Sequence, residues 1–199
     1  MLLYDYADSG NGYKVRLLLA QLGRACELRW VDIIAGATRT PAFLALNPNG
    51  RIPLLVLDDG TALAESNAIL CYLAEGTRFW AGDRTARAKA LQWLFFEQYS
   101  HEPYVATPRF ILRHLPADSP RRAELPARLA QGRAALQVME SQLARTPFLV
   151  GLHYGIADIA LYAYTHVADQ GGHVLEGFPN VQAWLTRVAA QPGHAPMLT

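Results

Sequence analysis

The sequence predicts two domains of different class, an α/β domain followed by an all-helical domain. Two observations lead to this prediction. As far as residue 76, short apolar runs of strand type alternate with helical patterns, whereas no segment after Arg84 has the pattern of a strand. A chain of 199 residues with 51% hydrophobic residues is long enough for one large core or two small ones. We therefore expect an α/β domain over residues 1–76, a linker over 77–84 and a helical domain over 85–199.

The first domain begins with the order strand, helix, strand. The runs LLYDY (2–6) and ELRWVDI (27–33) are predicted strands, because the first is apolar and the second alternates apolar with polar residues. Between them, residues 13–23 have a helical pattern that ends at Gly23, a residue suited to a helix C-terminus.

The rest of this domain is predicted to be a short helix, a hairpin and a final helix. Pro41 is expected at the first position of the short helix, where proline is tolerated. The Asp-Gly pair at 59–60 lies between two apolar runs and predicts a hairpin turn. Ser66 is expected to cap a helix that stops at Gly76, which completes the order βαβαββα.

The second domain shows four helical patterns. Residues 86–106 form a long amphipathic pattern that is interrupted at Pro103, and residues 119–144 form another. Residues 155–172 are almost wholly apolar, so this helix should lie at the centre of its domain. Residues 179–192 form a last amphipathic helix.

Charge and hydropathy exclude several classes of partner. The net charge is +1 and no basic run is interleaved with aromatic residues, so we expect neither nucleic acid nor an anionic membrane as a partner. No apolar stretch approaches the roughly 20 residues of a membrane span, and the N-terminal residues lack the pattern of a signal peptide. A cytoplasmic location is therefore expected.

The cysteines and histidines give no sign of a metal site. Cys26 and Cys71 lie in apolar segments outside any CxxC pair, and we expect buried, reduced thiols. The six histidines form no HExxH and have no paired spacing with cysteine. We expect no metal and no resident cofactor.

The turn DSGNGYKV, residues 8–15, has the composition of a ligand-binding turn between a strand and a helix. Ser9 and Asn11 offer hydroxyl and amide donors, and the two glycines allow a ligand to approach the backbone closely. Lys14 and Arg16 are expected in the first helical turn, where an anion would also be stabilised by the helix dipole. The alternative is an ordinary serine cap followed by loop glycines.

The segment NPNGRIP places Pro53 directly before a strand. This proline is either an ordinary edge proline or the second residue of a cis peptide bond. A cis bond would turn the backbone of Ile52 outward, where its N–H and C=O could pair with an extended peptide ligand.

Glu65 and Ser66 stand at the start of a predicted helix, where free N–H groups attract anions. With the negative charge of Glu65, this place could hold a group that carries both a carboxylate and an ammonium, such as the end of an amino acid. Arg39 and Arg51 could meet a second carboxylate, although surface arginines usually have no such specific role.

Aromatic and polar residues gather around Pro103 and on the central apolar helix. They are ordinary core and surface residues or the lining of an apolar pocket that faces the first domain. The residues around the proline are Tyr99, His101, Tyr104, Thr107 and Phe110. On the apolar helix, His166 follows Tyr162 by four residues and is a core or pocket-lining residue.

Taken together, these features resemble the cytosolic glutathione transferases over nearly the whole chain. The matching pieces are SGNGYKVRLLL, TPAFLALNPNGRIPLL, LAESNAILCYLA and GIADIALYAY. The chain looks most like bacterial members near the theta, beta and nu-like groups. The resemblance implies a thioredoxin-like first domain that binds glutathione as a cosubstrate. It also implies an all-helical second domain that contributes an apolar substrate pocket, and a homodimer.

The resemblance assigns roles to individual residues. Pro53 resembles the family's cis proline, so that Ile52 would pair by its backbone with the cysteinyl part of glutathione. Glu65 and Ser66 match the pair that holds the γ-glutamyl end of glutathione.

Four further residues are assigned in the same way. Arg39 and Arg51 fall near positions that reach the glycyl carboxylate. Ser9 matches the thiolate-binding serine of the theta type, and Asn11 matches the asparagine used in the nu-like group; we expect Ser9 as the leading donor. The expected lining of the second-substrate pocket is Tyr104, Thr107, Phe110, Tyr162 and His166.

The chain departs from the family pattern at two places. The buried helix begins with Gly155 in place of a serine or threonine, while Asp158 keeps its half of the capping motif. No cysteine stands in the turn after the first strand, which argues against mixed-disulfide chemistry there. In the linker, Phe79 and Trp80 are expected either at a dimer interface or between the domains.

The expected activity is that of a glutathione transferase, which activates glutathione as a thiolate for attack on a small, apolar electrophile. The alternatives are a glutathione-dependent disulfide reductase or peroxidase, and a non-catalytic glutathione-binding or regulatory protein on the same fold.

Overall fold

The computed structural model describes residues 1–198, and the chain divides into two compact units. The first unit contains Met1–Thr77 together with the residues from Pro192 onward, and the second contains Arg78–Gln191.

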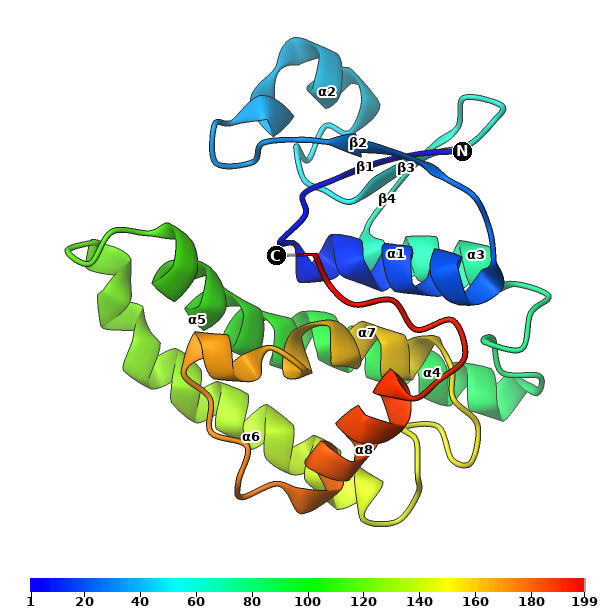
Figure 1. Ribbon diagram of the computed structural model, residues 1–199, viewed down its shortest axis with the longest axis vertical. Coiled ribbons are helices and arrows are strands. Elements are labelled where there is room, and N and C mark those ends of the chain that lie inside the picture. The colour runs from blue at the N-terminus through cyan, green and yellow to red at the C-terminus, as the bar shows by residue number, and fades with distance from the viewer. Residues whose placement is uncertain (199) are drawn as a thin grey trace. The chain divides into compact units, whose positions relative to one another are not determined.

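The first unit is built on a four-stranded sheet in the order β2-β1-β3-β4. β1 is parallel to β2 and antiparallel to β3, and β3 is antiparallel to β4. In Figure 1, α1 and α3 lie side by side on one face of this sheet and α2 lies on the other. The elements are β1 (Leu2–Asp5), α1 (Gly10–Leu22), β2 (Glu27–Trp30), α2 (Pro41–Leu46), β3 (Leu54–Val56), β4 (Ala62–Ala64) and α3 (Ser66–Ala74), with a short 3-10 turn, η1 (Ala37–Arg39), before α2. The predicted order βαβαββα is confirmed.

Local signals fix the ends of α1. The hydroxyl of Ser9 accepts a hydrogen bond from the backbone N–H of Gly12 at 3.1 Å, so Ser9 is the N-cap. Gly23 ends the helix at φ 63°, a left-handed conformation that glycine adopts without strain. The helix begins at Gly10, three residues before the predicted start at Tyr13, because the two glycines of the turn have helical backbone.

Two other boundaries differ from the prediction. β2 ends at Trp30 and all four of its residues are exposed, because β2 is an edge strand of the sheet. The predicted cap at Ser66 is wrong. Glu65 takes the N-cap position with φ 65° and makes no side-chain cap bond, and Ser66 is the first helical residue.

Residues 192–198 were expected in the helical domain but pack against α1 of the first unit (Figure 1). The hydroxyl of Tyr13 donates to the carbonyl of Ala195 at 2.7 Å. Gly193 has φ 74°, and a Cβ there would lie 3.0 Å from the Cα of Gln21. Proline and glycine at 192–193 end the helical pattern, and Tyr13 then holds the segment against α1.

The second unit is helical throughout its secondary structure except for one isolated bridge, between Phe148 and Gly151. Its elements are α4 (Arg84–Phe96), a π-helical segment η2 (Glu97–His101), α5 (Glu102–His114), η3 (Pro120–Glu124), α6 (Leu125–Leu143), α7 (Ile156–Thr165), η4 (Ala168–Gly171) and α8 (Pro179–Ala189). The predicted interruption at Pro103 is confirmed, since this proline stands in the first turn of α5 after the π-helical segment.

All ten residues of α7 are buried, as the apolar pattern predicts. Asp158 holds the start of this helix. Its Oδ2 accepts from the backbone N–H of Gly155 at 3.1 Å, and its Oδ1 accepts from Leu149 N at 3.0 Å and from Trp184 Nε1 at 2.9 Å. Burial raises the pKa of Asp158 from 3.8 to about 6, although these three donors favour the carboxylate. The prediction that Asp158 retains its capping role is confirmed.

Candidate functional site

Three segments that the sequence analysis singled out meet at one end of the sheet. Leu54 of β3 pairs with Tyr4 of β1 on one side and with Ala64 of β4 on the other. The turn after β1, the Ile52–Pro53 bond and the start of α3 therefore lie together at this end of the sheet. The residues one step beyond the paired row are Asp5, Pro53 and Glu65.

The Ile52–Pro53 peptide bond is cis, as the sequence analysis predicts from the resemblance. Pro53 is buried directly before β3. The side chain of Ile52 is half-buried and packs against the cluster of Val31, Phe43 and Leu54 on the α2 face of the sheet.

Asn11 and Ser66 come together from the first turns of α1 and α3. The hydroxyl of Ser66 donates to Oδ1 of Asn11 at 3.3 Å. Nζ of Lys14 donates to Oγ of Ser66 at 3.2 Å and to Oδ1 of Asn67 at 3.4 Å. A continuous chain of hydrogen bonds thus links the starts of the two helices.

Glu65 is connected to the NPNG turn. Its Oε1 accepts from Nδ2 of Asn49 at 3.4 Å, and the side chain of Glu65 is exposed. The buried Asn47 shapes the turn, because its Oδ1 accepts from Asn49 N at 3.1 Å and its Nδ2 donates to the carbonyl of Arg51 at 2.8 Å. Gly50, with φ 60°, supplies the left-handed position of the turn.

The two candidate arginines are both exposed. Arg39 donates from Nη1 to the carbonyl of Asn49 at 3.1 Å, which places its guanidinium on the same turn as the partner of Glu65. Gly50 makes room for this guanidinium, since a Cβ at position 50 would lie 2.5 Å from Nη1 of Arg39. Arg51 belongs to the same turn through its carbonyl, which Asn47 binds.

The expectation that Lys14 and Arg16 meet an anion in the first helical turn is wrong. Lys14 lies in the second turn, and its side chain is fully buried at Ser66 and Asn67. Nε of Arg16 donates to Oδ2 of Asp5 at 2.7 Å. The partners of Lys14 come from α3, more than fifty residues along the chain, and Asp5 is in the strand before the turn. Because all of these partners lie outside the turn, its local pattern does not reveal them.

Asp5 is the residue that the sequence analysis missed. Its carboxylate is fully buried and accepts from Tyr6 N at 2.7 Å as well as from Arg16. Burial raises the pKa of Asp5 from 3.8 to about 6, against the opposing effect of Arg16. The sequence contains a sign of this burial, since Asp5 falls on the same face of its strand as the buried Leu3.

The guanidinium of Arg16 extends from Asp5 to the turn that carries Ser9. Nη2 of Arg16 donates to the carbonyl of Ala7 at 2.8 Å and lies 3.5 Å from the carbonyl of Ser9. The buried ion pair therefore holds the backbone that presents Ser9 and the first turn of α1.

The residues expected to line the second-substrate pocket lie on α5 and at the end of α7. Tyr104, Thr107 and Phe110 are half-buried on α5. Tyr162 is buried with its ring stacked on His166 at 4.7 Å between centroids and against Trp184 at 6.1 Å. These contacts place Tyr162 in the core of the helical unit, and the pocket itself stays a prediction.

The linker aromatics are likewise packed inside the second unit. Phe79 is 2% exposed and meets Tyr154 edge to face at 6.0 Å. Phe79 therefore belongs to the core of the helical unit. This packing accounts for its burial without a dimer interface or a contact between the domains. Trp80 lines a small cavity of about 150 Å³ with residues of α4 and α7.

Other expectations concern the cysteines, metals and membranes. Cys26 and Cys71 are free but only half-buried, and this partial burial raises the pKa of each thiol.

Within residues 1–198, no group of three or more histidine, cysteine or acidic side chains could hold a metal ion. Over the same residues, no helix has both the length and the apolar character that a membrane crossing needs.

Comparison with known proteins decides the family. The model of the glutathione S-transferase N-terminal domain matches residues 9–75, and that of the C-terminal domain matches residues 90–192. The chain is a member of the glutathione transferase family. The matched ranges include the turn with Ser9, the NPNG turn and the start of α3.

Solved glutathione transferases have the same fold as this one. The crystal structure of a glutathione S-transferase from Pseudomonas fluorescens is 55% identical, covers 100% of this chain and 98% of its own, and has a TM-score of 0.95. A glutathione transferase from Burkholderia graminis, solved with two glutathione molecules bound per subunit, is 29% identical, with coverage of 96% and 84% and a TM-score of 0.84.

The names of two curated relatives describe two different activities. Glutathione S-transferase 3 of Zea mays is 34% identical, over 96% of this chain and 89% of its own length. The disulfide-bond oxidoreductase YfcG of Escherichia coli is 31% identical, over 94% of this chain and 89% of its own.

Proposed function

We propose that the protein binds glutathione on its first unit and activates the thiol for attack on a small, apolar electrophile. The observation that carries the proposal is the meeting of two helix starts, where the hydroxyl of Ser66 lies 3.3 Å from Oδ1 of Asn11 beside the end of the sheet that holds the cis-Pro53 bond. The solved relative from Burkholderia graminis with bound glutathione supports this ligand.

Each end of the tripeptide has suitable partners in this arrangement. The N-terminal turn of α3 and the Glu65 carboxylate suit the carboxylate and ammonium of the γ-glutamyl end. The backbone of Ile52 suits the cysteinyl part, and Arg39 or Arg51 suits the glycyl carboxylate. The thiol then falls to Ser9 and Asn11 at the start of α1.

Hydrogen bonding is strong enough to activate this thiol without a general base. An unperturbed thiol has a pKa of about 8.5, and a decrease of two units requires about 2.7 kcal/mol of preference for the thiolate. One hydrogen bond to a charged group contributes about 1.5–3 kcal/mol, and the N-terminus of α1 adds about 0.3–1 kcal/mol. The sum is of the required size.

The test is glutathione binding by calorimetry, followed by titration of the ultraviolet thiolate band of bound glutathione in the wild type, Ser9→Ala and Asn11→Ala. We expect the midpoint of the wild type to lie below that of free glutathione and at least one variant to raise it. The rate at which glutathione is conjugated to an aryl halide is then measured for the same three proteins. A wild type that does not bind glutathione contradicts the proposal.

A second candidate function is glutathione-dependent disulfide reduction, which the similarity to YfcG favours. The same thiolate would attack a mixed disulfide in place of an electrophilic carbon. Turnover of a glutathione mixed disulfide without conjugation of the aryl halide would favour this candidate, and turnover of a hydroperoxide would favour a peroxidase. Binding with none of these turnovers would favour a non-catalytic binding protein.

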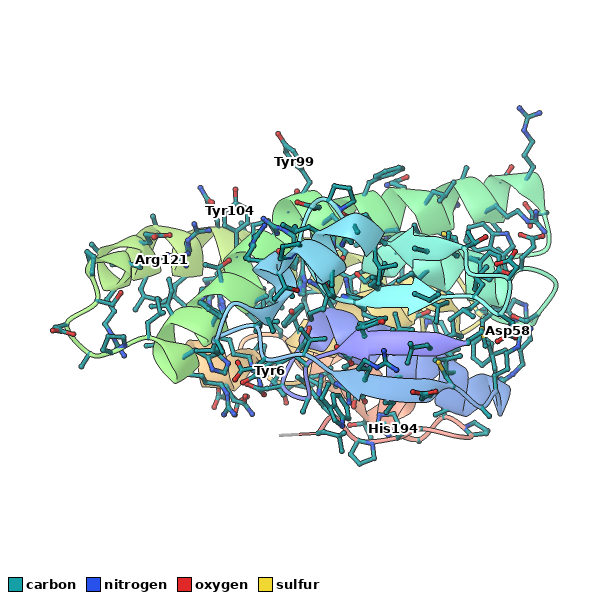
Figure 2. The ribbon with its side chains drawn as sticks, turned by 90° about the horizontal axis from the view of Figure 1, so that it is seen from above. Tyr6, Asp58, Tyr99, Tyr104, Arg121 and His194 are labelled. Carbon is teal, nitrogen blue, oxygen red and sulfur yellow. The ribbon has the colours of Figure 1, made fainter. Side chains whose placement is uncertain are left out.

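We also propose a homodimer, through the outer face of α4 and η2. Leu91, Phe95 and Tyr99 follow one another at intervals of four residues and are 38%, 71% and 85% exposed. Figure 2 shows Tyr99 projecting away from its helix. Exposed aromatic residues at this spacing are typical of a contact surface.

We also propose that the protein is located in the cytoplasm.

A further inference from the structure

The side chain of Lys14 is fully buried in the second turn of α1, between Ser66 and Asn67. A lysine ammonium has three hydrogen-bond donors and no acceptor. In its hydrogen bonds to Oγ of Ser66 at 3.2 Å and to Oδ1 of Asn67 at 3.4 Å, Lys14 is therefore the donor.

This polarity sets the direction of the next hydrogen bond. Because Oγ of Ser66 accepts from Lys14, its own proton is directed to another acceptor, and Oδ1 of Asn11 lies 3.3 Å away. The carboxamide of Asn11 thus turns its oxygen toward Ser66. Its NH2 group, which is the other end of a planar amide, is directed away from Ser66.

We infer that Lys14 is a positioning residue, which fixes the orientation of the Asn11 amide through Ser66 so that Asn11 presents its NH2 to the thiolate. The inference rests on the proposed binding of glutathione at this site. A reversed amide would present its oxygen to the thiolate and repel it.

Ser9 depends on a different set of contacts. Its Oγ accepts from the backbone N–H of Gly12 at 3.1 Å, within its own turn. The orientation of the Ser9 hydroxyl is therefore set locally and does not pass through Lys14. Loss of Lys14 should act on the thiolate through Asn11 and leave the contribution of Ser9 unchanged.

The experiment is a double-mutant cycle, read as the midpoint of the thiolate titration of bound glutathione. Lys14→Met keeps the length of the side chain and removes the donors. We expect it to raise the midpoint by about one pKa unit, which is a tenfold loss of thiolate below the midpoint. In an Asn11→Ala background it should cause no further shift, and in a Ser9→Ala background it should cause the full shift. The same variant should lower kcat and leave KM for glutathione nearly unchanged.

Two further variants separate this role from a structural one. Ser66→Ala leaves Lys14 in place and removes the link to Asn11, so it should reproduce the shift even if Lys14→Met does not fold. Arg24→Met removes one positive charge from the far end of α1, where Arg24 donates to the carbonyl of Leu73 at 3.2 Å, and should leave the midpoint unchanged.

The outcomes distinguish the inference from the proposed function. If the wild type binds no glutathione, the proposed function fails and the inference fails with it. If the wild type binds glutathione as a thiolate, equal shifts from Lys14→Met with and without Asn11 overturn the positioning role alone. An unchanged midpoint in Ser66→Ala overturns it as well.

Discussion

A Cβ at position 12 would lie 1.6 Å from Oδ1 of Asp5. Gly12 is in the first turn of α1, and the carboxylate of Asp5 fills the space where a side chain would be. The carboxylate cannot move aside easily, because it is fully buried and is bound by Tyr6 N and by Arg16, each at 2.7 Å.

Gly12→Ala should therefore destabilise the protein. Forcing an extra group into a packed site destabilises by about 1–3 kcal/mol, and we expect at least this loss in the free energy of unfolding measured with urea. Gly82→Ala is the matched control, since a Cβ at Gly82 has no atom within 4 Å. Equal stability of the two variants would contradict the packing of Asp5 under Gly12.

Stability should fall as the pH rises from about 4 to about 6. Asp5 and Asp158 have a pKa of about 6 in the folded protein, against an ordinary value of 3.8. Between these values the folded state binds more protons than the unfolded state, so each group's contribution is complete below 3.8 and is lost as the pH rises through about 6. Two units correspond to at most about 3 kcal/mol for each group.

Urea unfolding over this pH range checks the prediction. Asp5→Asn should remove part of the slope, and Asp158→Asn should remove another part. A slope that neither substitution changes would show that other groups are responsible for it.

Asp158→Ala should be among the most destabilising single substitutions in the helical unit. It leaves the N–H groups of Leu149, Gly155 and Trp184 without their acceptor, at about 1–3 kcal/mol for each buried group. Asp158→Asn keeps one oxygen and should lie between the wild type and Asp158→Ala. Asp118→Ala, at an exposed loop position, should unfold like the wild type. The order of the thermal midpoints measures this directly.

Two substitutions at Glu65 should separate stability from glutathione binding. Glu65 has φ 65°, which is unfavourable for any residue with a side chain. Glu65→Gly should therefore unfold at a higher urea concentration than the wild type but bind glutathione more weakly. Glu65→Gln keeps the backbone strain and removes the charge, so it should lose affinity with no gain in stability. If both variants bind glutathione as the wild type does, Glu65 has no role in the site.

The proposed dimer should depend on the face of α4 and η2. Phe95→Asp combined with Tyr99→Asp should convert a species of about twice 22.0 kDa into the 22.0 kDa chain in sedimentation at micromolar concentration. Leu152→Asp, at another exposed position of the same unit, is the control. A wild type that sediments as a monomer contradicts the proposal.

Elements with local signals were predictable from the sequence. The Asp-Gly pair gives a hairpin between β3 and β4, in which Leu57 N donates to Thr61 O at 2.9 Å. Gly23 ends α1, and the apolar run at Ile156–Thr165 gives a wholly buried helix. In each case residues close in sequence determine the structure.

Features that depend on distant partners were not predictable in this way. The exposure of Leu28 and Trp30 follows from the edge position of β2, which the alternating pattern does not specify. Ser66 has the composition of a cap, yet its hydroxyl is used by Lys14 and Asn11 from the other helix.

The same distinction applies to the candidate site. Ser9, Asn11 and Ser66 were singled out from their turns, and the structure brings Asn11 and Ser66 into contact. The roles of Lys14 and Arg16 could not be read from the turn, because their partners are Ser66 and Asp5. A polar residue on the inward face of a strand, as at Asp5, is the signal that would have helped.

Residues 192–198 pack against α1 through Tyr13, although the whole helical unit separates them from the rest of the first unit in sequence. On the ribosome, α1 is therefore made long before the segment that covers one side of it. The N-terminal unit cannot reach its final packing while it is being translated, but only after the helical unit has also been synthesised. A nascent chain that stalls within α8 would hold the residues proposed to bind glutathione without this closing segment.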